Sequence, residues 1–407
     1  MIYATKKIKL LFVIESLTIS GSEKSLITLL SNIDPDLYEI DLQLFRYGGE
    51  LDKNVPNYVN LLDCLAFVQY SSESWKHNIK AVFSKNKISY FIAKLNYSLR
   101  LRFRKRGVSE ISKLYWESVS HLLEKTDKEY DFAIAFAQGA PTYYVKDIIK
   151  AKRKIAWVNA NMVIKNQNKK FQEKYYNDFD KIVAISEGAK NHLINILPQF
   201  SHKYLIIPNI IDFKSIPKMA ELYEAPIKTN KFNILTVGRL DNRMKGMDIT
   251  IEACKILKEK GIDFHWFIIG NGEFKGVMET FINKYNLNGH LNLLGAINNP
   301  YPYFKKADLY VQTSRSEGYG RTIAEARMLN LPIVTTNFDT VGLQIEHLKN
   351  GVITEINPEA VADGIIKIMN DKELYNSIVE YLKREPKENT ETVKRFDAMI
   401  SNLLTTN

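Results

Sequence analysis

The stretch that most constrains the fold is residues 307–337, which read ADLYVQTSRSEGYGRTIAEARMLNLPIVTTN. It begins with an apolar run typical of a buried strand, and after Pro332 it ends with a second run rich in β-branched residues. Between the two runs, a loop with Gly318 and Gly320 leads into a helical stretch that ends near Leu329. A strand, a glycine-bearing loop, a helix and another strand in this order predict a βαβ unit.

The loop of this unit carries groups that suit ligand binding. Glu317 stands in the loop, and Glu325 stands eight residues later inside the predicted helix. Gly318 and Gly320 let the backbone approach a ligand closely, and the free N–H groups at a helix start attract anions. Taken alone, the same pattern also fits an ordinary βαβ turn with an acidic residue at the helix start.

The rest of the chain repeats this alternation of apolar strands and helices. The strands are expected at 8–14, 38–45, 59–64, 131–137, 154–159, 181–186, 204–208, 233–237, 264–269 and 291–295. Because helices separate most of them, the pattern predicts an α/β fold with mostly parallel, doubly wound sheets. With 407 residues, of which 45% are hydrophobic, two domains are expected.

Short polar motifs follow several of these strands. In chain order they are SGSE at 20–23, WVN at 157–159, the strand end at Ser186, PNIID at 208–212, GRL at 238–240, KG at 245–246 and GNGE at 270–273. Each motif alone is weakly or moderately specific. Their common order and their strand–loop–helix contexts are together hard to obtain by chance.

These motifs and the E-x7-E pair resemble the family 4 glycosyltransferases, which are retaining enzymes of the GT-B fold. The resemblance covers nearly the whole chain, best from 204 to 356 and least from 65 to 130. It implies two Rossmann-like, doubly wound domains that face a central cleft, with a C-terminal helix that crosses back to the first domain. We therefore expect an acceptor-side domain over 1–212, a linker over 213–231, a nucleotide-sugar-binding domain over 232–385 and a final helix over 386–407 that packs on the first domain.

The resemblance also implies roles for individual residues. Glu317 is expected beneath the donor sugar, Glu325 at the ribose hydroxyls, and Arg239 and Lys245 at the donor diphosphate. Fixed cations suit this position because negative charge grows on the diphosphate as it leaves, so they stabilise the transition state most. We expect Glu317, Arg239 and Lys245 to be catalytic. Further donor contacts are expected at Gly318, Tyr319, Gly320, Arg321, Thr322, Gly238, Gly270, Gly272 and Gly21.

The acceptor-side motifs depart from the family pattern at two points. The loop SGSE keeps only Gly21 of two family glycines, and WVN places Asn159 where relatives carry a histidine. Asparagine cannot take a proton at neutral pH. In a retaining, front-face reaction the departing phosphate oxygen can accept the proton of the acceptor instead. Asn159 and Ser186 are the expected acceptor-side residues.

The segment 84–109 breaks the alternation of strands and helices. It has no acidic residue, and its aromatic and aliphatic residues are interleaved with Lys85, Lys87, Lys94, Arg100, Arg102, Arg104, Lys105 and Arg106. A basic amphipathic stretch of this kind is typical of an element that binds an anionic membrane surface. Nucleic acid would select the same residue types, and a solvated helix face would tolerate them. We prefer the membrane surface and expect no nucleic-acid partner.

Composition excludes several classes of protein. The two cysteines, Cys64 and Cys254, are too few for a disulfide framework or a cysteine-rich metal site, which favours a reducing compartment. The lysines and short apolar run at the start fit a first strand better than a signal peptide, and no run approaches the roughly 20 apolar residues of a membrane span. The net charge of +10 suits an anionic partner.

Other chemistries are disfavoured by the placement of the acidic residues. Glu317 and Glu325 would lie roughly 10 Å or more apart on one loop–helix unit, which does not suit the carboxylate pair of a glycosidase. The Asp-x-Asp pairs at 34–36 and 178–180 flank a turn and a strand start, so we expect no metal. We also expect no other cofactor, because no lysine can be argued to hold a pyridoxal group.

Two functions from different classes remain open. The first is a hexosyltransferase that moves a sugar from a nucleotide-sugar donor, most simply a UDP-sugar, to a glycan or lipid-linked acceptor in bacterial surface-polysaccharide synthesis. Such an enzyme would work at the cytoplasmic face of the membrane. The second is a catalytically weak GT-B scaffold that binds a partner glycosyltransferase or the membrane, which Asn159 and the altered SGSE loop motivate. The intact cation pair and both glutamates favour the enzyme.

Overall fold

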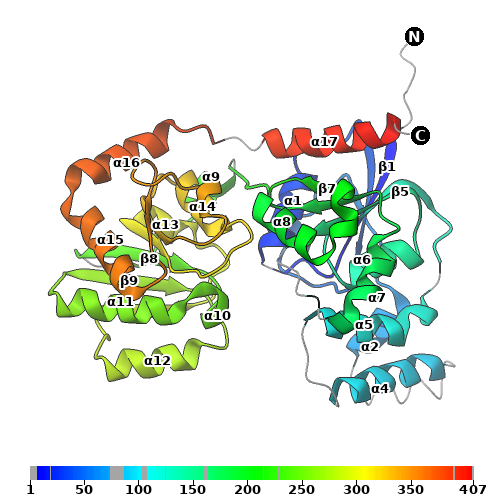
Figure 1. Cartoon of the computed structure of the whole chain (residues 1–407), viewed down its shortest axis with the longest axis horizontal. Helices are drawn as coiled ribbons and strands as arrows, with labels where there is room; N and C mark the ends of the chain where they lie inside the picture. The colour runs from blue at the N-terminus through cyan, green and yellow to red at the C-terminus, as the bar shows by residue number, and fades with distance from the viewer. Residues whose placement is uncertain are drawn as a thin grey trace, which may run out of the picture. The chain divides into compact units, whose positions relative to one another are not determined.

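The computed structural model describes residues 7–18, 20–73, 87–102, 108–123, 125–159, 164, 166–213, 215–227, 230–387 and 390–405. Sequence positions Lys85, Arg104, Lys105 and Arg106 of the basic segment therefore lie outside the described residues. The chain divides into two compact units (Figure 1). Unit 1 comprises Met1–Ile210 and Glu391–Asn407, and unit 2 comprises Ile211–Thr390.

Unit 1 is built on a seven-stranded parallel sheet with the order β3-β2-β1-β4-β5-β6-β7. Its strands are β1 (Ile8–Ile14), β2 (Tyr38–Leu44), β3 (Val59–Leu61), β4 (Glu129–Ala135), β5 (Lys150–Val158), β6 (Lys181–Ala184) and β7 (Tyr204–Ile206). The central strands are near-continuous apolar runs because both faces of the sheet are covered. The strand order reverses between β1 and β4, so ligands are expected at the carboxyl ends of these two strands.

The helices of unit 1 connect successive strands and cover the sheet. They are α1 (Gly21–Leu30), α2 (Ala66–Ser72), α4 (Ile88–Arg102), α5 (Val108–Val119), α6 (Ala140–Asp147), α7 (Asn166–Tyr176) and α8 (Glu187–Ile196), with short 3-10 turns at Asp52–Asn54, Ser120–Leu122 and Pro198–Lys203. In the part of the chain that the structure describes, no helix is long and apolar enough to cross a membrane.

The last helix, α17 (Thr390–Thr405), belongs to unit 1 although it follows unit 2 in the chain. Phe396 is fully buried, and its ring stacks on Phe12 of β1 with a centroid distance of 6.0 Å. The hydroxyl of Tyr38 donates a hydrogen bond of 2.8 Å to Asp397 Oδ1. This helix therefore completes the core on one side of the unit 1 sheet, as the fold prediction required.

Unit 2 is built on a six-stranded parallel sheet with the order β10-β9-β8-β11-β12-β13. Its strands are β8 (Phe232–Val237), β9 (Phe264–Ile269), β10 (Leu291–Gly295), β11 (Leu309–Gln312), β12 (Ile333–Thr336) and β13 (Val352–Thr354). The chain first builds β8, β9 and β10 outward, then returns to place β11 on the other side of β8. The strand order thus reverses between β8 and β11.

Helices cover both faces of the unit 2 sheet. They are α9 (Ser215–Ala220), α10 (Asn242–Lys245), α11 (Met247–Glu259), α12 (Lys275–Lys284), α13 (Tyr301–Lys306), α14 (Arg321–Met328), α15 (Pro358–Asn370) and α16 (Lys372–Arg384), with a 3-10 turn at Val341–Leu343. Successive strand residues point to opposite faces, so Ile234 packs in the core beneath α11 and α15, and Leu235 packs in the core beneath α13 and α14. Helix α9 lies inside the stretch 213–231 that the sequence suggested as a linker, and it packs against α13. The predicted doubly wound α/β class is confirmed in both units.

Candidate functional site

Except for Gly21, the predicted donor-side residues lie in unit 2, most of them after the carboxyl ends of β8 and β11. Gly238 and Arg239 follow β8, and residues 313–317 follow β11. These strands are neighbours in the sheet, although more than 70 residues separate their paired positions, such as Leu309 and Ile234. The site therefore lies where the strand order reverses, which is the position that binds ligands in open α/β sheets.

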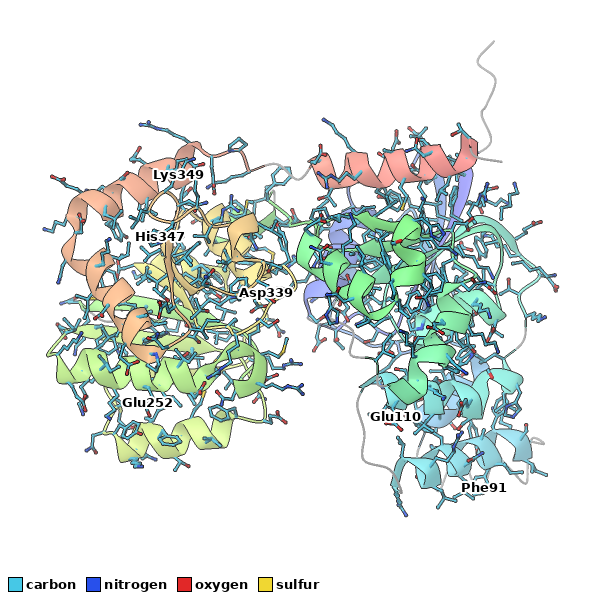
Figure 2. All side chains as sticks on the ribbon, in the orientation of Figure 1. Phe91, Glu110, Glu252, Asp339, His347 and Lys349 are labelled. Atoms are coloured by element: carbon cyan, nitrogen blue, oxygen red, sulfur yellow. The ribbon has the colours of Figure 1, made fainter. Side chains whose placement is uncertain are left out.

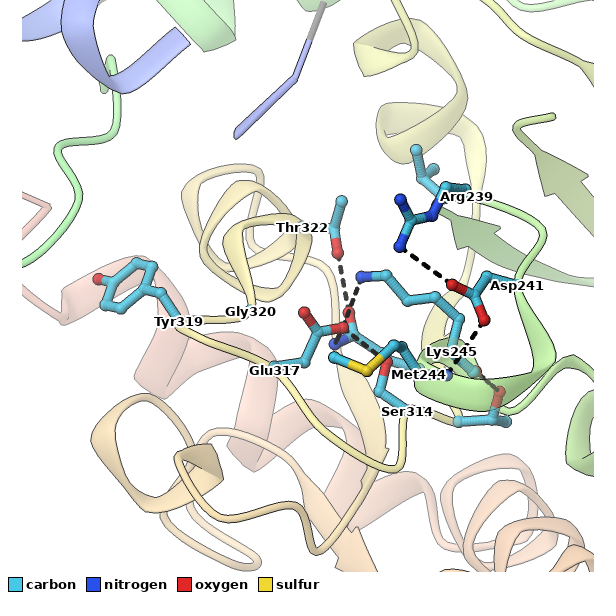
Figure 3. A network of polar contacts seen from close by, with 12 residues as sticks. Arg239, Asp241, Met244, Lys245, Ser314, Glu317, Tyr319, Gly320 and Thr322 are labelled. Carbon is cyan, nitrogen blue, oxygen red and sulfur yellow. Dashed lines mark hydrogen bonds and ion pairs between the residues drawn. The ribbon is translucent and has the colours of Figure 1, made fainter. Parts of the chain in front are cut away.

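The carboxylate of Glu317 is the centre of this site (Figure 3). Its Oε1 atom accepts three hydrogen bonds, from Lys245 Nζ at 2.5 Å, Ser314 Oγ at 2.6 Å and Gln312 Nε2 at 2.9 Å. The side chain is 12% exposed. No residue within the described ranges donates to its Oε2 atom, so this oxygen can accept a further donor.

A buried hydrogen-bond chain holds Gln312 in the orientation that serves Glu317. The Oε1 atom of Gln312 accepts from Thr322 Oγ1 at 2.8 Å and from the Tyr310 hydroxyl at 3.0 Å. Burial raises the pKa of Tyr310, so its phenol remains a donor at neutral pH. Because both donors occupy the amide oxygen, the amide nitrogen must point to the carboxylate.

The segment with Lys245 is fixed against the end of β11 by Gly246. Gly246 has φ +61°, and a Cβ atom there would lie 2.2 Å from the carbonyl oxygen of Thr313. The Thr313 hydroxyl also donates to the Lys245 carbonyl oxygen at 3.0 Å. Only glycine permits this backbone conformation and this close approach together, and the approach brings Lys245 to Glu317.

An ion pair also joins the segment around Lys245 to the loop that follows β11. The two terminal guanidinium nitrogens of Arg315, Nη1 and Nη2, each donate to the Asp248 carboxylate at 2.7 Å, and the Arg315 backbone N–H donates to the Met244 carbonyl oxygen at 2.8 Å. Burial acts to raise the pKa of Asp248, but the hydrogen bonds from Arg315 outweigh it, and the net pKa is lowered. The β8 and β11 loops are thus held together by several polar contacts.

Both predicted diphosphate cations contact carboxylates. Lys245 contacts Glu317, and Arg239 Nη2 lies 3.0 Å from Asp241 Oδ2. The Arg239 side chain is 67% exposed, and Asp241 also caps α10 by accepting from the backbone N–H groups of Arg243 and Met244. Arg239 is therefore held loosely at the surface beside a carboxylate that is fixed by the helix start.

The glycine loop leads directly into α14. Gly320 has φ +73° and precedes the first turn, where no side chain caps the helix. The amide of Gln344 holds the loop by donating to the carbonyl oxygens of Tyr319 and Gly320. Among the described residues, no acceptor pairs with the backbone N–H groups of Gly318, Tyr319 or Gly320. These groups and the positive end of the α14 dipole can receive an anion.

Glu325 is buried one turn into α14. Its Oε1 atom lies 3.1 Å from Arg321 Nε and accepts from the Tyr301 hydroxyl at 3.2 Å. Burial raises the pKa of Tyr301 well above its ordinary value, and the nearby Glu325 charge raises it further. Arg321 thus places an opposite charge directly beside the buried Glu325 carboxylate.

Close packing of the backbone requires glycine at both glycine positions of the GNGE loop. A Cβ atom at Gly270 would lie 1.8 Å from the Gly238 carbonyl oxygen, and one at Gly272 would lie 2.3 Å from the Leu240 carbonyl oxygen. A Cβ atom at Gly238 would lie 3.8 Å from Lys245 Cε. The β9 loop therefore packs directly on the β8 loop that carries Arg239.

The predicted residues of unit 1 follow β1, β5 and β6. Gly21 is the first residue of α1, after the N-cap Ser20. Asn159 Nδ2 donates to the Phe136 carbonyl oxygen at 2.6 Å, and its Oδ1 atom is buried without a hydrogen bond to a described residue. Ser186 caps α8 by accepting from the Ala189 N–H at 3.1 Å. The Ser186 hydroxyl therefore has a structural role at the start of α8.

Sequence reasoning missed Gln312 and Ser314, which fix Glu317. The available signal was the position of Gln312, a buried amide at the end of the apolar strand β11. Among the described residues, no group of three or more histidine, cysteine, aspartate or glutamate side chains could hold a metal ion.

Residues 220–385 match the family described as Glycosyl transferases group 1. This stretch of the chain is thus similar to group 1 glycosyltransferases. It contains Arg239, Lys245, Glu317 and Glu325, the four residues around which the site is built.

Relatives of this chain occur in archaea and bacteria. The chain is 26% identical over 344 residues to the uncharacterized glycosyltransferase MJ1178 of Methanocaldococcus jannaschii, an alignment that covers 83% of this chain and 89% of that protein. It is 27% identical to the capsular polysaccharide biosynthesis glycosyltransferase CapM of Staphylococcus aureus, over 48% of this chain and 54% of CapM. It is 29% identical to N-acetylgalactosamine-N,N'-diacetylbacillosaminyl-diphospho-undecaprenol 4-alpha-N-acetylgalactosaminyltransferase of Campylobacter jejuni, over 48% of this chain and 53% of that protein. Apart from MJ1178, the chain thus spans about half the length of these relatives.

The whole chain also resembles solved structures. Anabaena HepE, crystallised with UDP and glucose, has a TM-score of 0.67 and 16% sequence identity, over 97% of this chain and 99% of HepE. This likeness shows the fold, which is GT-B, as predicted from the sequence motifs.

Proposed function

We propose that the chain is a retaining hexosyltransferase that moves a sugar from a UDP-sugar to a glycan or lipid-linked acceptor during synthesis of a bacterial surface polysaccharide. The observation that carries this proposal is the Lys245–Glu317 contact of 2.5 Å where the strand order of the unit 2 sheet reverses. Beside it are the N–H groups before α14, which have no acceptor among the described residues. The names of CapM and of the Campylobacter relative support a surface glycan, and the HepE complex supports UDP. Such an enzyme would act at the cytoplasmic face of the membrane.

The diphosphate of the donor would bind at the start of α14. Its oxygens would accept from the backbone N–H groups of Gly318, Tyr319 and Gly320, and its charge would be met by Lys245 and Arg239. Arg239 is exposed enough to turn from Asp241 to a phosphate oxygen, and arginine pairs with phosphate through two parallel hydrogen bonds. Because these groups supply the positive charge, the proposal assigns no step to a metal ion.

The second glutamate would anchor the nucleoside. Glu325 would accept from the ribose hydroxyls while Arg321 and Tyr301 keep its carboxylate in place. Glu317 would lie beneath the sugar, where its Oε2 atom can accept a sugar hydroxyl. Its negative charge would also favour the positive charge that develops at the anomeric carbon.

In the transfer step, the bond between the anomeric carbon and the β-phosphate oxygen breaks, and its electron pair stays on the phosphate. The acceptor hydroxyl oxygen forms its bond to the anomeric carbon on the same face, so the configuration is retained. The hydroxyl proton passes to the departing phosphate oxygen. Asn159 would position groups on the acceptor side without taking this proton, since an amide is not a base at neutral pH.

Thermal unfolding of the purified protein with millimolar UDP, GDP, ADP or CMP tests the donor site. A nucleotide at 100 times its dissociation constant stabilises the folded state by about 2.7 kcal/mol. We expect a raised midpoint with UDP and no such increase in the Lys245→Met variant. NMR of the transfer product would then report the anomeric configuration. A folded protein that responds to none of the nucleotides would overturn the proposal and favour the scaffold.

A further inference from the structure

Residues 337–345, which we call the β12 segment, follow strand β12 and contact the glycine loop, residues 317–320. Asp339 of this segment is labelled in Figure 2. The side chains of Phe338 and Ile345 are buried in the core of unit 2. The core therefore holds the β12 segment in place against the glycine loop.

Two buried side chains of the β12 segment donate to carbonyl groups of the glycine loop. The Thr340 hydroxyl donates to the Glu317 carbonyl oxygen at 3.1 Å. The amide nitrogen of Gln344 donates to the Tyr319 carbonyl oxygen, and also to the Gly320 carbonyl oxygen at 3.0 Å. Thr340 is 4% exposed and Gln344 is 5% exposed, so water does not compete for these contacts.

The planarity of the peptide bond converts these contacts into directions for N–H groups. In a trans peptide, the carbonyl of one residue and the N–H of the next point in opposite directions. The first carbonyl, held by Thr340, belongs to the peptide that carries the N–H of Gly318. The second, held by Gln344, belongs to the peptide that carries the N–H of Gly320. Both N–H groups therefore point away from the β12 segment.

Backbone hydrogen bonds do not replace these two contacts. Among the described residues, no backbone N–H donates to the carbonyl oxygen of Glu317 or of Tyr319. The Gly320 carbonyl oxygen, in contrast, also accepts from the Ile323 N–H at 3.0 Å. The orientation of the other two peptide groups thus depends on side chains of the β12 segment.

The amide oxygen of Gln344 is buried without a donor among the described residues. The backbone of Gln344 is fixed, because its N–H donates to the Val341 carbonyl oxygen at 3.0 Å and its carbonyl oxygen accepts from Asn350 Nδ2 at 2.9 Å. A buried amide oxygen without a donor destabilises the folded state. An apolar side chain of similar size would avoid this penalty, so the stability of the fold does not explain a glutamine here. The orientation of the glycine loop does.

We propose that Thr340 and Gln344 are positioning residues of the donor site, which present the N–H groups of Gly318 and Gly320 to the oxygens of a diphosphate. Each side chain acts through one peptide group of the glycine loop. N–H groups fixed in this way stabilise the charge that grows on a leaving diphosphate without reorienting during the reaction. The assignment of the anion to a sugar donor rests on the proposed function. Anion binding itself can be measured without a nucleotide, with inorganic pyrophosphate.

Solution NMR of the full chain labelled with 15N-glycine tests the proposal, because Gly318 and Gly320 each give their own amide signal. We expect both signals to shift when pyrophosphate is added to the wild type. Thr340→Val keeps the shape of the side chain but removes its hydroxyl, and it should abolish the shift of Gly318 and retain that of Gly320. Gln344→Met should abolish the shift of Gly320 and retain that of Gly318. The retained shift shows in each case that the loop is still folded.

Calorimetric titration with pyrophosphate supplies the affinities. Thr340→Val and Gln344→Met should each bind about tenfold more weakly, which is the effect of losing one hydrogen bond to a charged group. Thr340→Ser restores the hydroxyl and should bind as the wild type does. Two matched controls should leave binding unchanged. Thr335→Val removes a buried hydroxyl of β12, and Gln43→Met removes a buried amide that donates to the Leu44 and Asp63 carbonyl oxygens in unit 1.

A wild type whose Gly318 and Gly320 signals do not respond to pyrophosphate would overturn the proposal. Variants that respond as the wild type does, or a variant that loses both shifts, would refute the assignment of one side chain to each N–H group. Binding of pyrophosphate without stabilisation by any nucleotide would contradict the proposed donor and leave the two positioning roles intact. Failure of the positioning roles and failure of the proposed function therefore give different results.

Discussion

The substitution Gly246→Ala provides a sharp test of how the site is assembled. A left-handed backbone costs a residue with a Cβ atom about 1–2 kcal/mol. The new methyl group would also lie 2.2 Å from the Thr313 carbonyl oxygen, so the β8 and β11 loops must separate. Such overpacking typically costs about 1–3 kcal/mol more. We therefore expect a total loss of roughly 2–5 kcal/mol in unit 2 and a weakened response to UDP, because Lys245 moves away from Glu317.

Gly261→Ala is the matched control for this test. Gly261 has φ +71°, ends the segment after α11, and has nothing within 4 Å of the position of an added Cβ atom. Gly261→Ala should therefore destabilise the fold only by the cost of a left-handed backbone, about 1–2 kcal/mol, and should leave the stabilisation by UDP unchanged. Differential scanning calorimetry can follow the nucleotide-sensitive transition, in which about 1 kcal/mol moves the midpoint by roughly 2–4 °C. Equal losses in the two variants would refute the argument that close packing on Thr313 positions Lys245.

Three further predictions follow from contacts described above. Glu317→Gln keeps the shape of the side chain but removes its charge, and it should lower the turnover of the UDP-sugar at least a hundredfold; the exposed Glu273→Gln serves as its control, and unchanged turnover would contradict the role of Glu317. The folded-state pKa of Asp248 lies below its ordinary value of 3.8. The pairing with Arg315 therefore stabilises the fold fully above the ordinary pKa, and this stabilisation is lost as the pH falls through the folded-state pKa. The midpoint of Asp248→Asn should therefore fall less than that of the wild type between about pH 5 and 3, and parallel curves would argue against this pair. Phe396→Ala, which empties a fully buried position between α17 and β1, should cost unit 1 about 3–5 kcal/mol by urea unfolding; a loss below about 1 kcal/mol would contradict the packing of α17 on β1.

The sequence predicted those features that depend on local patterns. Most strands of both sheets appear as apolar runs, although β13 (Val352–Thr354) was not predicted. The roles expected of Arg239 and Glu317 came from the resemblance to family motifs and stay predictions. The final helix was implied by the same resemblance, and Phe396 and Ile400 are buried on it. The strands need only the periodicity of the chain to be predicted.

The contacts within the site could not be read in the same way. The approach of Lys245 to Glu317 depends on the return of the chain to place β11 beside β8, which is a long-range event. In the sequence, Gln312 is not distinguishable from an ordinary residue at a strand end. Only the structure shows that Tyr310 and Thr322 donate to its amide oxygen.

Two sequence patterns were compatible with more than one structural role. The glycines at 270 and 272 read as a nucleotide loop, but the same residues are required by the close packing of the β9 and β8 loops. The basic segment identified an amphipathic helix without showing that Lys94 turns inward toward α2. A pattern of residue types cannot separate such roles, because the neighbouring backbone decides between them.

The placement of α17 has a consequence for the order in which the two units form during synthesis. Unit 2 is one continuous segment, Ile211–Thr390, so all of its contacts are available before the last residues leave the ribosome. Unit 1 begins the chain, yet its packing is complete only after α17 has been made. Phe12 then contacts Phe396, and Tyr38 donates to Asp397. We therefore expect unit 1, which is made first, to complete its packing after unit 2, with the apolar surface around β1 open to chaperones until α17 has been made.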